Sequence, residues 1–191
     1  YLFLKKRIGL VTTPAGYNAR MHSSVDIFRE NYDLRALFSP EFGFYGDRKG
    51  GENVSTFVDD RTGLCVYGIF GGTYRPAPGM LSEIDVLVFD VPDAGVRYSS
   101  FPLTMLYCMQ SCAKEGKTFV VLDRPNPLGG LQVEGCRPEI LESEKYVSYG
   151  VPQRYALTMG ELAFFLNNEK KIGCDVHVVP MEYYRRDMFF E

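Results

Sequence analysis

Short apolar runs alternate with polar segments along the whole chain. Runs of five to seven residues rich in Val, Ile, Leu and Phe predict strands, because that length and composition fit a buried strand better than a helix. The predicted strands are 7–12, 34–38, 64–70, 85–91, 118–123 and 175–180. The run 85–91 is almost continuously apolar, which is typical of a parallel strand covered on both faces.

Segments with helical spacing lie between these runs. The predicted helices are 23–30, 78–82, 102–114 and 158–171. Ser23 or Ser24 would cap the first of them, and Gly116 is typical of a residue that follows a helix. Thr158 and Glu161 have the spacing of a capping box. Strands that alternate with helices predict an α/β fold with a mostly parallel sheet and helices on both of its faces.

Two segments show neither the apolar pattern of a strand nor that of a helix. Residues 47–63 are polar and glycine-rich and predict a long loop, and residues 128–153 predict a loop or an extended excursion. The chain has no internal repeat, no G-x-G-x-x-G motif after the first strand and no Walker A motif. A dinucleotide-binding or P-loop nucleotide-binding domain therefore lacks its main sequence evidence.

The composition suits one domain with a sizeable core. The chain has 191 residues, of which 46% are hydrophobic, and its formal net charge is −3. Nucleic acids and anionic membrane surfaces require a basic partner, so neither is expected here. No apolar run reaches the ~18 residues that span a bilayer.

The five cysteines indicate neither a disulfide framework nor a metal site. An odd number in a chain of this length is unlike a disulfide scaffold, and no metal-ligand spacing emerges from the cysteines and the two histidines. We expect no metal and no organic cofactor, and we expect most cysteines to act as small buried hydrophobic side chains.

Glu41 is the first candidate for chemistry. The apolar run 34–38 ends near Pro40, which rarely lies inside a central strand, so Glu41 falls just past a carboxyl end. Ligands of open α/β sheets bind outside these ends. The neighbouring aromatic residues, among them Phe42 and Phe44, could form an apolar wall that raises the pKa of the carboxyl, as a general acid requires. A solvated carboxylate in a turn explains the same pattern equally well.

Further carboxylates follow other predicted strands. Asp90 and Asp93 follow one strand, and Asp123 with Arg124 follows another. The carboxyl ends of parallel strands share one edge, so several carboxylates could converge with Glu41 there. Paired carboxylates are the equipment of glycoside hydrolysis, in which one of them protonates the leaving oxygen. Asp is also common after strands as a helix cap or turn former, and this alternative stays open for each of them.

An ordered set of motifs resembles the NamZ-type exo-β-N-acetylmuramidases, a family formerly catalogued as a domain of unknown function. The motifs are residues 8–16 (IGLVTTPAG), 39–43 (SPEFG) with Gly46 and Asp47, 85–90 (DVLVFD), 93–97 (DAGVR), 121–130 (VLDRPNPLGG), 133–135 (VEG), 152–154 (PQR), 158–163 (TMGELA) and 178–181 (VVPM). Each motif alone is weak, but the set covers nearly the whole chain in order.

The resemblance implies an architecture and an activity. The family combines a Rossmann-like N-terminal domain with a second domain, and its active site lies in the cleft between them. Residues 1–191 would form the first domain only, and the missing C-terminal domain is expected to pack on it. The implied function is a glycoside hydrolase that removes terminal non-reducing MurNAc from peptidoglycan fragments during cell-wall turnover. Its partner would be a peptidoglycan-derived sugar or muropeptide.

The resemblance also implies roles for individual residues. Glu41 matches the family's motif glutamate and is the expected catalytic acid. Asp93 or Asp123 could act as its partner, as could the acetamido group of the substrate or a residue of the missing domain. The expected substrate-binding residues are Asp47, Arg97, Arg124, Asn126, Glu134 and Arg154.

The three arginines of this set could clamp the lactyl carboxylate that distinguishes MurNAc from GlcNAc. Salt bridges to nearby Asp residues are the alternative, and Asp93 could simply pair with Arg97.

Three positions depart from the family pattern. Phe42 replaces the histidine that follows the glutamate, Thr13 replaces an asparagine, and Tyr155 replaces a histidine. Each change removes a polar group near the expected cleft. A non-catalytic muropeptide- or sugar-binding protein is therefore the rival prediction, and a Rossmann-like nucleotide-binding domain is a third. The substrate class favours an extracellular or periplasmic location, whereas the odd number of cysteines leaves a cytoplasmic one open.

Overall fold

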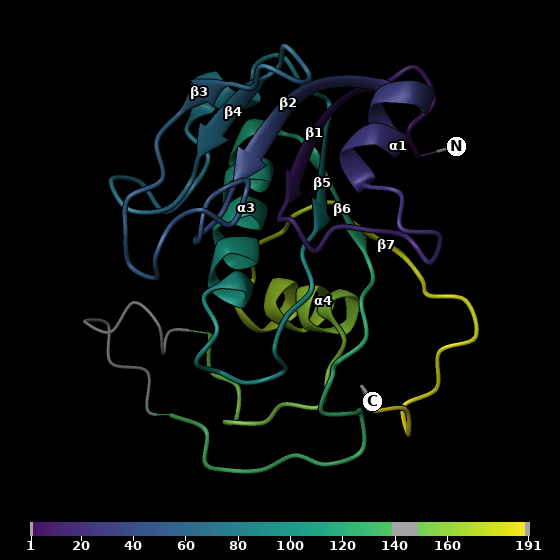
Figure 1. Ribbon diagram of the computed structural model, residues 1–191. Helices are drawn as coiled ribbons and strands as arrows, with labels where there is room; N and C mark the ends of the chain where they lie inside the picture. Colours follow the sequence, from purple (N-terminus) through teal and green to yellow (C-terminus); the bar gives the residue numbers. More distant parts are fainter. Residues whose placement is uncertain (1, 139–148, 190–191) are drawn as a thin grey trace.

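The computed structural model describes residues 2–138 and 149–189, which contain one seven-stranded sheet (Figure 1). The strands lie in the spatial order β3-β4-β2-β1-β5-β6-β7. Their bounds are β1 Arg7–Thr12, β2 Asp33–Ser39, β3 Phe57–Val58, β4 Cys65–Gly68, β5 Val86–Asp90, β6 Thr118–Leu122 and β7 Val176–Val179. All neighbouring strands pair in parallel except β3, which pairs antiparallel with β4 at one edge. The six parallel strands have the order of a doubly wound Rossmann sheet.

In the part of the chain that the structure describes, four helices connect the strands. They are α1 Ser24–Asn31, α2 Pro78–Leu81, α3 Phe101–Glu115 and α4 Met159–Glu169. The caps expected from the sequence are present at the starts of α1 and α4 and at the end of α3. The Ser23 side chain accepts a hydrogen bond from Asp26 N at the start of α1, and Gly116 ends α3 in the left-handed region with φ of 63°. Thr158 and Glu161 form the predicted capping box of α4.

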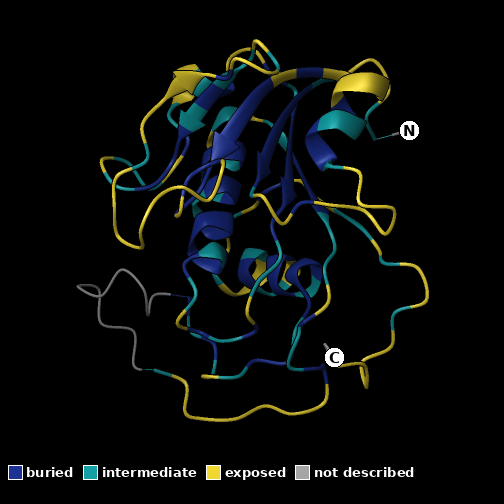
Figure 2. Ribbon diagram, viewed as in Figure 1, coloured by how far each residue is buried: buried dark blue, intermediate teal, exposed yellow. Residues whose placement is uncertain are grey.

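The sheet separates two apolar cores (Figure 2). On one face, α1 packs with Val25 and Phe28 against side chains such as Leu10 and Leu37. On the other face, α2, α3 and α4 cover a larger cluster, which includes Phe38 and Phe89. The α/β class, the mostly parallel sheet and the helices on both faces are therefore confirmed.

The short strand β3 is the element that the sequence analysis missed. It lies inside the predicted loop 47–63, and Phe57 and Val58 pair with Val66 and Cys65. Two exposed residues carry too short a pattern to be recognised, and only the partner strand makes them a strand. Within 128–153, residues 139–148 lie outside the described residues. Glu134 of this segment forms an isolated bridge with Arg154, which also bridges Val96.

Two further features concern the helices and the cysteines. Among the residues that the structure describes, no helix has the length and apolar character to cross a bilayer. The five cysteines are unpaired, and Cys108, Cys112 and Cys174 are buried. Burial raises the pKa of the Cys174 thiol to about 12, so this side chain is a neutral core group.

Candidate active site

Glu41 lies two residues beyond the end of β2, as the sequence predicted. Its side chain is buried, and Oε1 accepts a hydrogen bond of 2.7 Å from the backbone N–H of Gly51. The chain turns sharply here because Phe42 and Gly43 both adopt positive φ, of 74° and 84°. This turn folds the loop that carries Gly51 back over the carboxyl end of β2. Among the described residues, Oε2 has no hydrogen-bond partner.

A cavity of about 590 Å³ opens beside Glu41. Its lining residues are Glu41, Phe42, Ala94, Val96, Tyr98, Ser99, Ser100 and Phe101. The Phe42 and Phe101 rings pack edge to face with centroids 6.1 Å apart, and Tyr98 is 69% exposed. Of these lining residues only Glu41 carries a formal charge. The site therefore combines one carboxyl group with an aromatic wall, and its volume suits a small-molecule ligand.

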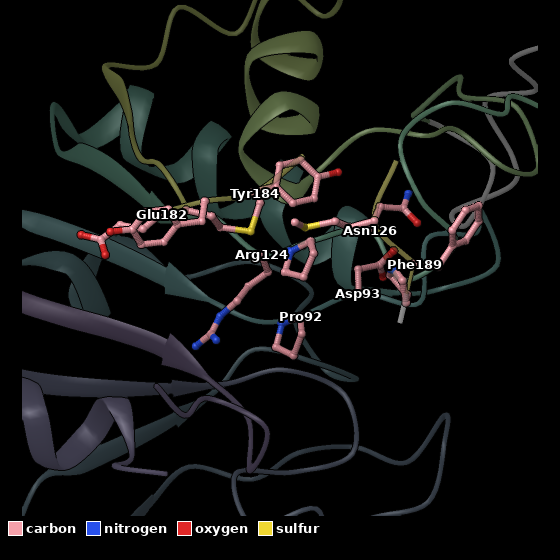
Figure 3. A pocket seen from close by; sticks show the side chains of 12 residues that line it. Pro92, Asp93, Arg124, Asn126, Glu182, Tyr184 and Phe189 are labelled. Carbon is pink, nitrogen blue, oxygen red and sulfur yellow. The ribbon is translucent and has the colours of Figure 1, made fainter. Parts of the chain in front are cut away.

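Asp93 lines a different and larger cavity. This cavity has about 770 Å³ and lies between the loops 92–93 and 124–127 and the segment 181–189 (Figure 3). Asp93 Oδ2 accepts hydrogen bonds from Gly95 N at 2.9 Å and from the Tyr155 hydroxyl, whereas Oδ1 is buried without a partner among the described residues. Burial, and the charge of Asp93, raise the pKa of Tyr155 well above its ordinary value. Tyr155 therefore keeps its proton and acts as a donor to Asp93.

Asp123 holds the start of α4. Its carboxylate accepts hydrogen bonds from Gly160 N at 2.7 Å, from Thr158 Oγ1 at 3.0 Å and from Arg124 N at 3.0 Å. Burial raises the pKa of Asp123, and these hydrogen bonds oppose the shift only in part. The geometry is that of a helix-capping side chain, the alternative that the sequence left open.

Arg124 is tied to Asp90. The guanidinium donates from Nε and Nη2 to the Asp90 carboxylate at 2.7 and 2.9 Å, and from Nη1 to the Tyr17 carbonyl at 2.8 Å. Asp90 is completely buried and also accepts a hydrogen bond from the Ser24 hydroxyl. In Figure 3 the guanidinium points away from Asp93. This pair lies where the strand order reverses between β1 and β5, the crevice in which doubly wound folds bind nucleotides.

The other two arginines are also engaged within the protein. Arg97 is buried, and its Nη1 donates to the carbonyls of Cys136 at 2.8 Å and Val151 at 3.1 Å, so it does not pair with Asp93. Arg154 donates to Gln132 at 2.9 Å, to the Leu128 carbonyl and to the exposed Glu134 at 3.4 Å.

Asn126 and Asp47 differ in their surroundings. Asn126 is buried and shapes its loop, because Oδ1 accepts from Leu128 N at 2.9 Å and Nδ2 donates to the Leu157 carbonyl at 3.1 Å. Asp47 is exposed and lies 3.7 Å from Arg48.

The structure therefore divides the predicted site residues into three groups. Glu41 lines the aromatic cavity, and Asp93, Arg124 and Asn126 line the larger one. The residues that line neither are Asp47, Arg97, Asp123, Glu134 and Arg154. Sequence reasoning did not single out Ser100, which lines the Glu41 cavity and has a buried hydroxyl without a partner among the described residues. The only feature of the sequence that could have drawn attention to Ser100 is its position two residues before Pro102, at the start of a helix.

No metal site accompanies these groups within 2–138 and 149–189. The described residues contain no cluster of three or more His, Cys, Asp or Glu side chains that could hold a metal ion.

Comparison with known proteins identifies the family. Residues 8–191 match the model of the N-terminal domain of the exo-beta-N-acetylmuramidase NamZ. The chain belongs to this NamZ N-terminal family. It is 45% identical over 97% of its length to the peptidoglycan beta-N-acetylmuramidase NamZ of Bacillus subtilis (strain 168), and it covers 45% of that protein.

Two crystal structures share the NamZ N-terminal fold. Both are DUF1343 family proteins from Bacteroides fragilis NCTC 9343. One is 40% identical with a TM-score of 0.90, and the other is 28% identical with a TM-score of 0.83. The chain is covered to 99% and 98%, and it covers 48% and 50% of theirs. The chain thus spans about half the length of its relatives.

Proposed function

We propose that this chain forms the Glu41-bearing half of an exo-β-N-acetylmuramidase that removes terminal non-reducing MurNAc from peptidoglycan fragments. The observation that carries the proposal is the placement of Glu41 at the carboxyl end of β2, in an aromatic cavity, within a chain of the NamZ N-terminal family. The Bacillus relative bears the name of a peptidoglycan beta-N-acetylmuramidase.

Glu41 acts as the general acid in this proposal. The Gly51 N–H holds Oε1, and Oε2 is left to carry the proton to the glycosidic oxygen. The carboxyl group lies beside the paired rings of Phe42 and Phe101 in a cavity whose volume suits a sugar-sized ligand.

Of the partner groups considered from the sequence, we favour the two that lie outside the chain. Asp93 lines the other cavity and Asp123 is committed to capping α4, so neither shares the cavity with Glu41. We therefore propose that the group acting at the anomeric centre is the acetamido group of the substrate or a residue of the second half that the relatives possess. This second half would pack over the open side of the Glu41 cavity, and the enzyme would work outside the cell or in the periplasm.

The test compares wild type with Glu41→Gln, each at the length that the gene encodes. Both are incubated with MurNAc-β-1,4-GlcNAc and with the matching GlcNAc-terminated disaccharide. We expect the wild type to release MurNAc and Glu41→Gln to be slower by about 10²–10⁴-fold, the usual contribution of a general acid. Glu52→Gln is the matched control, because Glu52 is exposed in the same loop and its carboxylate accepts a hydrogen bond only from Lys49 N in the described structure. It should retain wild-type turnover.

Other outcomes separate the rival functions. Saturable binding of the MurNAc disaccharide without release would identify a binding protein, and Phe42→His would then be the first reversion to examine. Thermal stabilisation by nucleotides would support the nucleotide-binding prediction. We expect no such stabilisation, because the chain has neither a G-x-G-x-x-G motif after the first strand nor a Walker A motif, and the Arg124 guanidinium at the switch point is already paired with Asp90.

A further inference from the structure

Ser100 has an unused hydrogen-bonding group at the Glu41 cavity. The residue is 7% exposed and lines the cavity, yet its Oγ is buried and has no partner among the described residues. Its backbone is in the α region, with φ of −82° and ψ of −15°, and the side chain makes no capping hydrogen bond to α3. A buried hydroxyl without a partner costs stability, so a ligand acceptor that reaches it regains a hydrogen bond.

Ser100 also stands at the amino end of a long helix. The 15 residues of α3 place the positive end of the helix dipole at the cavity, where Ser99, Ser100 and Phe101 are lining residues. No acidic side chain lies in the first turn of α3 to neutralise it. A negatively charged ligand group is therefore favoured at this end of the cavity.

The surroundings add to this preference. The buried guanidinium of Arg97 lies 5.8 Å from the centroid of the Tyr98 ring, so a positive charge stands behind the aromatic wall. Phe42, Tyr98 and Phe101 line the remaining wall and add no negative charge to it.

The arginines expected to bind the substrate carboxylate have other partners. Arg124 pairs with Asp90, Arg154 contacts Gln132 and Glu134, and Arg97 donates to backbone carbonyls. None of the three lines the Glu41 cavity. The carboxylate that distinguishes MurNAc from GlcNAc needs another donor.

We propose that Ser100 and the amino end of α3 form the carboxylate subsite of the Glu41 cavity. In this arrangement the lactyl carboxylate accepts a hydrogen bond from the Ser100 hydroxyl, while the α3 dipole stabilises the negative charge. Ser100 is a specificity-determining residue in this arrangement. The inference rests on the proposed function, since it names how the same cavity selects MurNAc.

The test measures binding of the monosaccharides MurNAc and GlcNAc by isothermal titration calorimetry. The proteins are wild type, Ser100→Ala and Ser111→Ala, each at its natural length. Ser111 is the matched control, because it is a buried serine of the same helix whose hydroxyl donates to the Pro76 carbonyl, away from the Glu41 cavity. We expect Ser100→Ala to weaken MurNAc binding by about tenfold or more, the usual effect of a hydrogen bond to a charged group, and to leave GlcNAc binding unchanged.

A second variant, Ser100→Asp, tests the charge. It places a carboxylate at the subsite and should weaken MurNAc binding more than Ser100→Ala does, whereas Asp at a helix start favours α3 itself. Circular dichroism of each variant verifies folding. Ser111→Ala should keep the MurNAc-to-GlcNAc affinity ratio of the wild type.

The inference and the proposed function fail in different ways. An unchanged affinity ratio in Ser100→Ala overturns the subsite, even if the wild type releases MurNAc. A MurNAc preference that depends on Ser100, in a protein without turnover, supports the subsite and overturns the hydrolase. Absence of any MurNAc binding to the wild type overturns the subsite, whereas the hydrolase is overturned only if the disaccharide is not cleaved.

Discussion

Arg124 forms an ion pair with the buried carboxylate of Asp90 at the carboxyl edge of the sheet. Its side chain is 23% exposed, and Asp90, which it contacts through two hydrogen bonds, is completely buried. A buried carboxylate is tolerated only when it is paired, because removal from water is costly for an isolated charge. The pair also joins the end of β5 to the loop after β6 and, through the Tyr17 carbonyl, to the loop before α1.

We expect Arg124→Met to lower the free energy of unfolding by about 3–5 kcal/mol, since it leaves Asp90 buried without its cation. Urea denaturation measures the change. Arg185→Met is the matched control, because the Arg185–Asp187 pair is exposed on both sides, and it should cost less than about 1 kcal/mol. Equal effects of the two substitutions would contradict a structural role for Arg124. The double variant Asp90→Asn/Arg124→Met should recover part of the loss.

The residues at the N-cap positions of α3 and α4 differ in whether their side-chain hydroxyl is used in hydrogen bonds within the protein. At α4, the Thr158 hydroxyl accepts from Glu161 N at 3.2 Å and donates to Asp123 at 3.0 Å. At α3, the Ser100 hydroxyl makes neither kind of bond. Two residues in equivalent positions therefore have different roles, and this difference is measurable.

We expect Thr158→Ala to lower the free energy of unfolding by about 1–2 kcal/mol, because it removes the cap of α4 and one hydrogen bond of Asp123. Ser100→Ala should change stability by less than about 0.5 kcal/mol, or raise it, because no hydrogen bond is lost. Chemical denaturation of both variants gives the comparison. A loss in Ser100→Ala as large as that in Thr158→Ala would show that Ser100 supports α3 rather than a ligand.

At the scale of the whole molecule, Asp85 stabilises the edge of the sheet at which the strands begin, opposite the edge that carries Glu41. Its carboxylate accepts hydrogen bonds from the side chain and the backbone N–H of Arg7, and so links the starts of β1 and β5. The hydrogen bond from the Arg7 side chain is the largest cause that lowers the pKa of Asp85 to about 2, below its ordinary value of 3.8. A depressed folded-state pKa means that ionised Asp85 stabilises the native state.

The resulting pH dependence has a definite sign. The contribution of Asp85 is fully present above about pH 4 and is lost as the pH falls through 2, because the proton then binds in the folded state as well. We expect Asp85→Asn to be less stable than wild type at pH 5, and we expect this difference to shrink steadily toward pH 2. Urea denaturation at several pH values measures it. A difference that stays constant from pH 5 to pH 2 would contradict the assigned pKa.

The sequence by itself determined the order of the helices and of every strand except β3, the mostly parallel α/β class and the position of Glu41 after β2. These features are local, since apolar period, caps and Pro40 act within a few residues. Only the tertiary structure decided which polar groups meet. Arg124 reaches Asp90, 34 residues earlier, because β1, β5 and β6 are adjacent in the sheet. Strand order also brings Ser100 to the same cavity as Glu41, since α3 starts at the sheet edge where β2 ends. Such meetings depend on strand order, which no short stretch of sequence encodes.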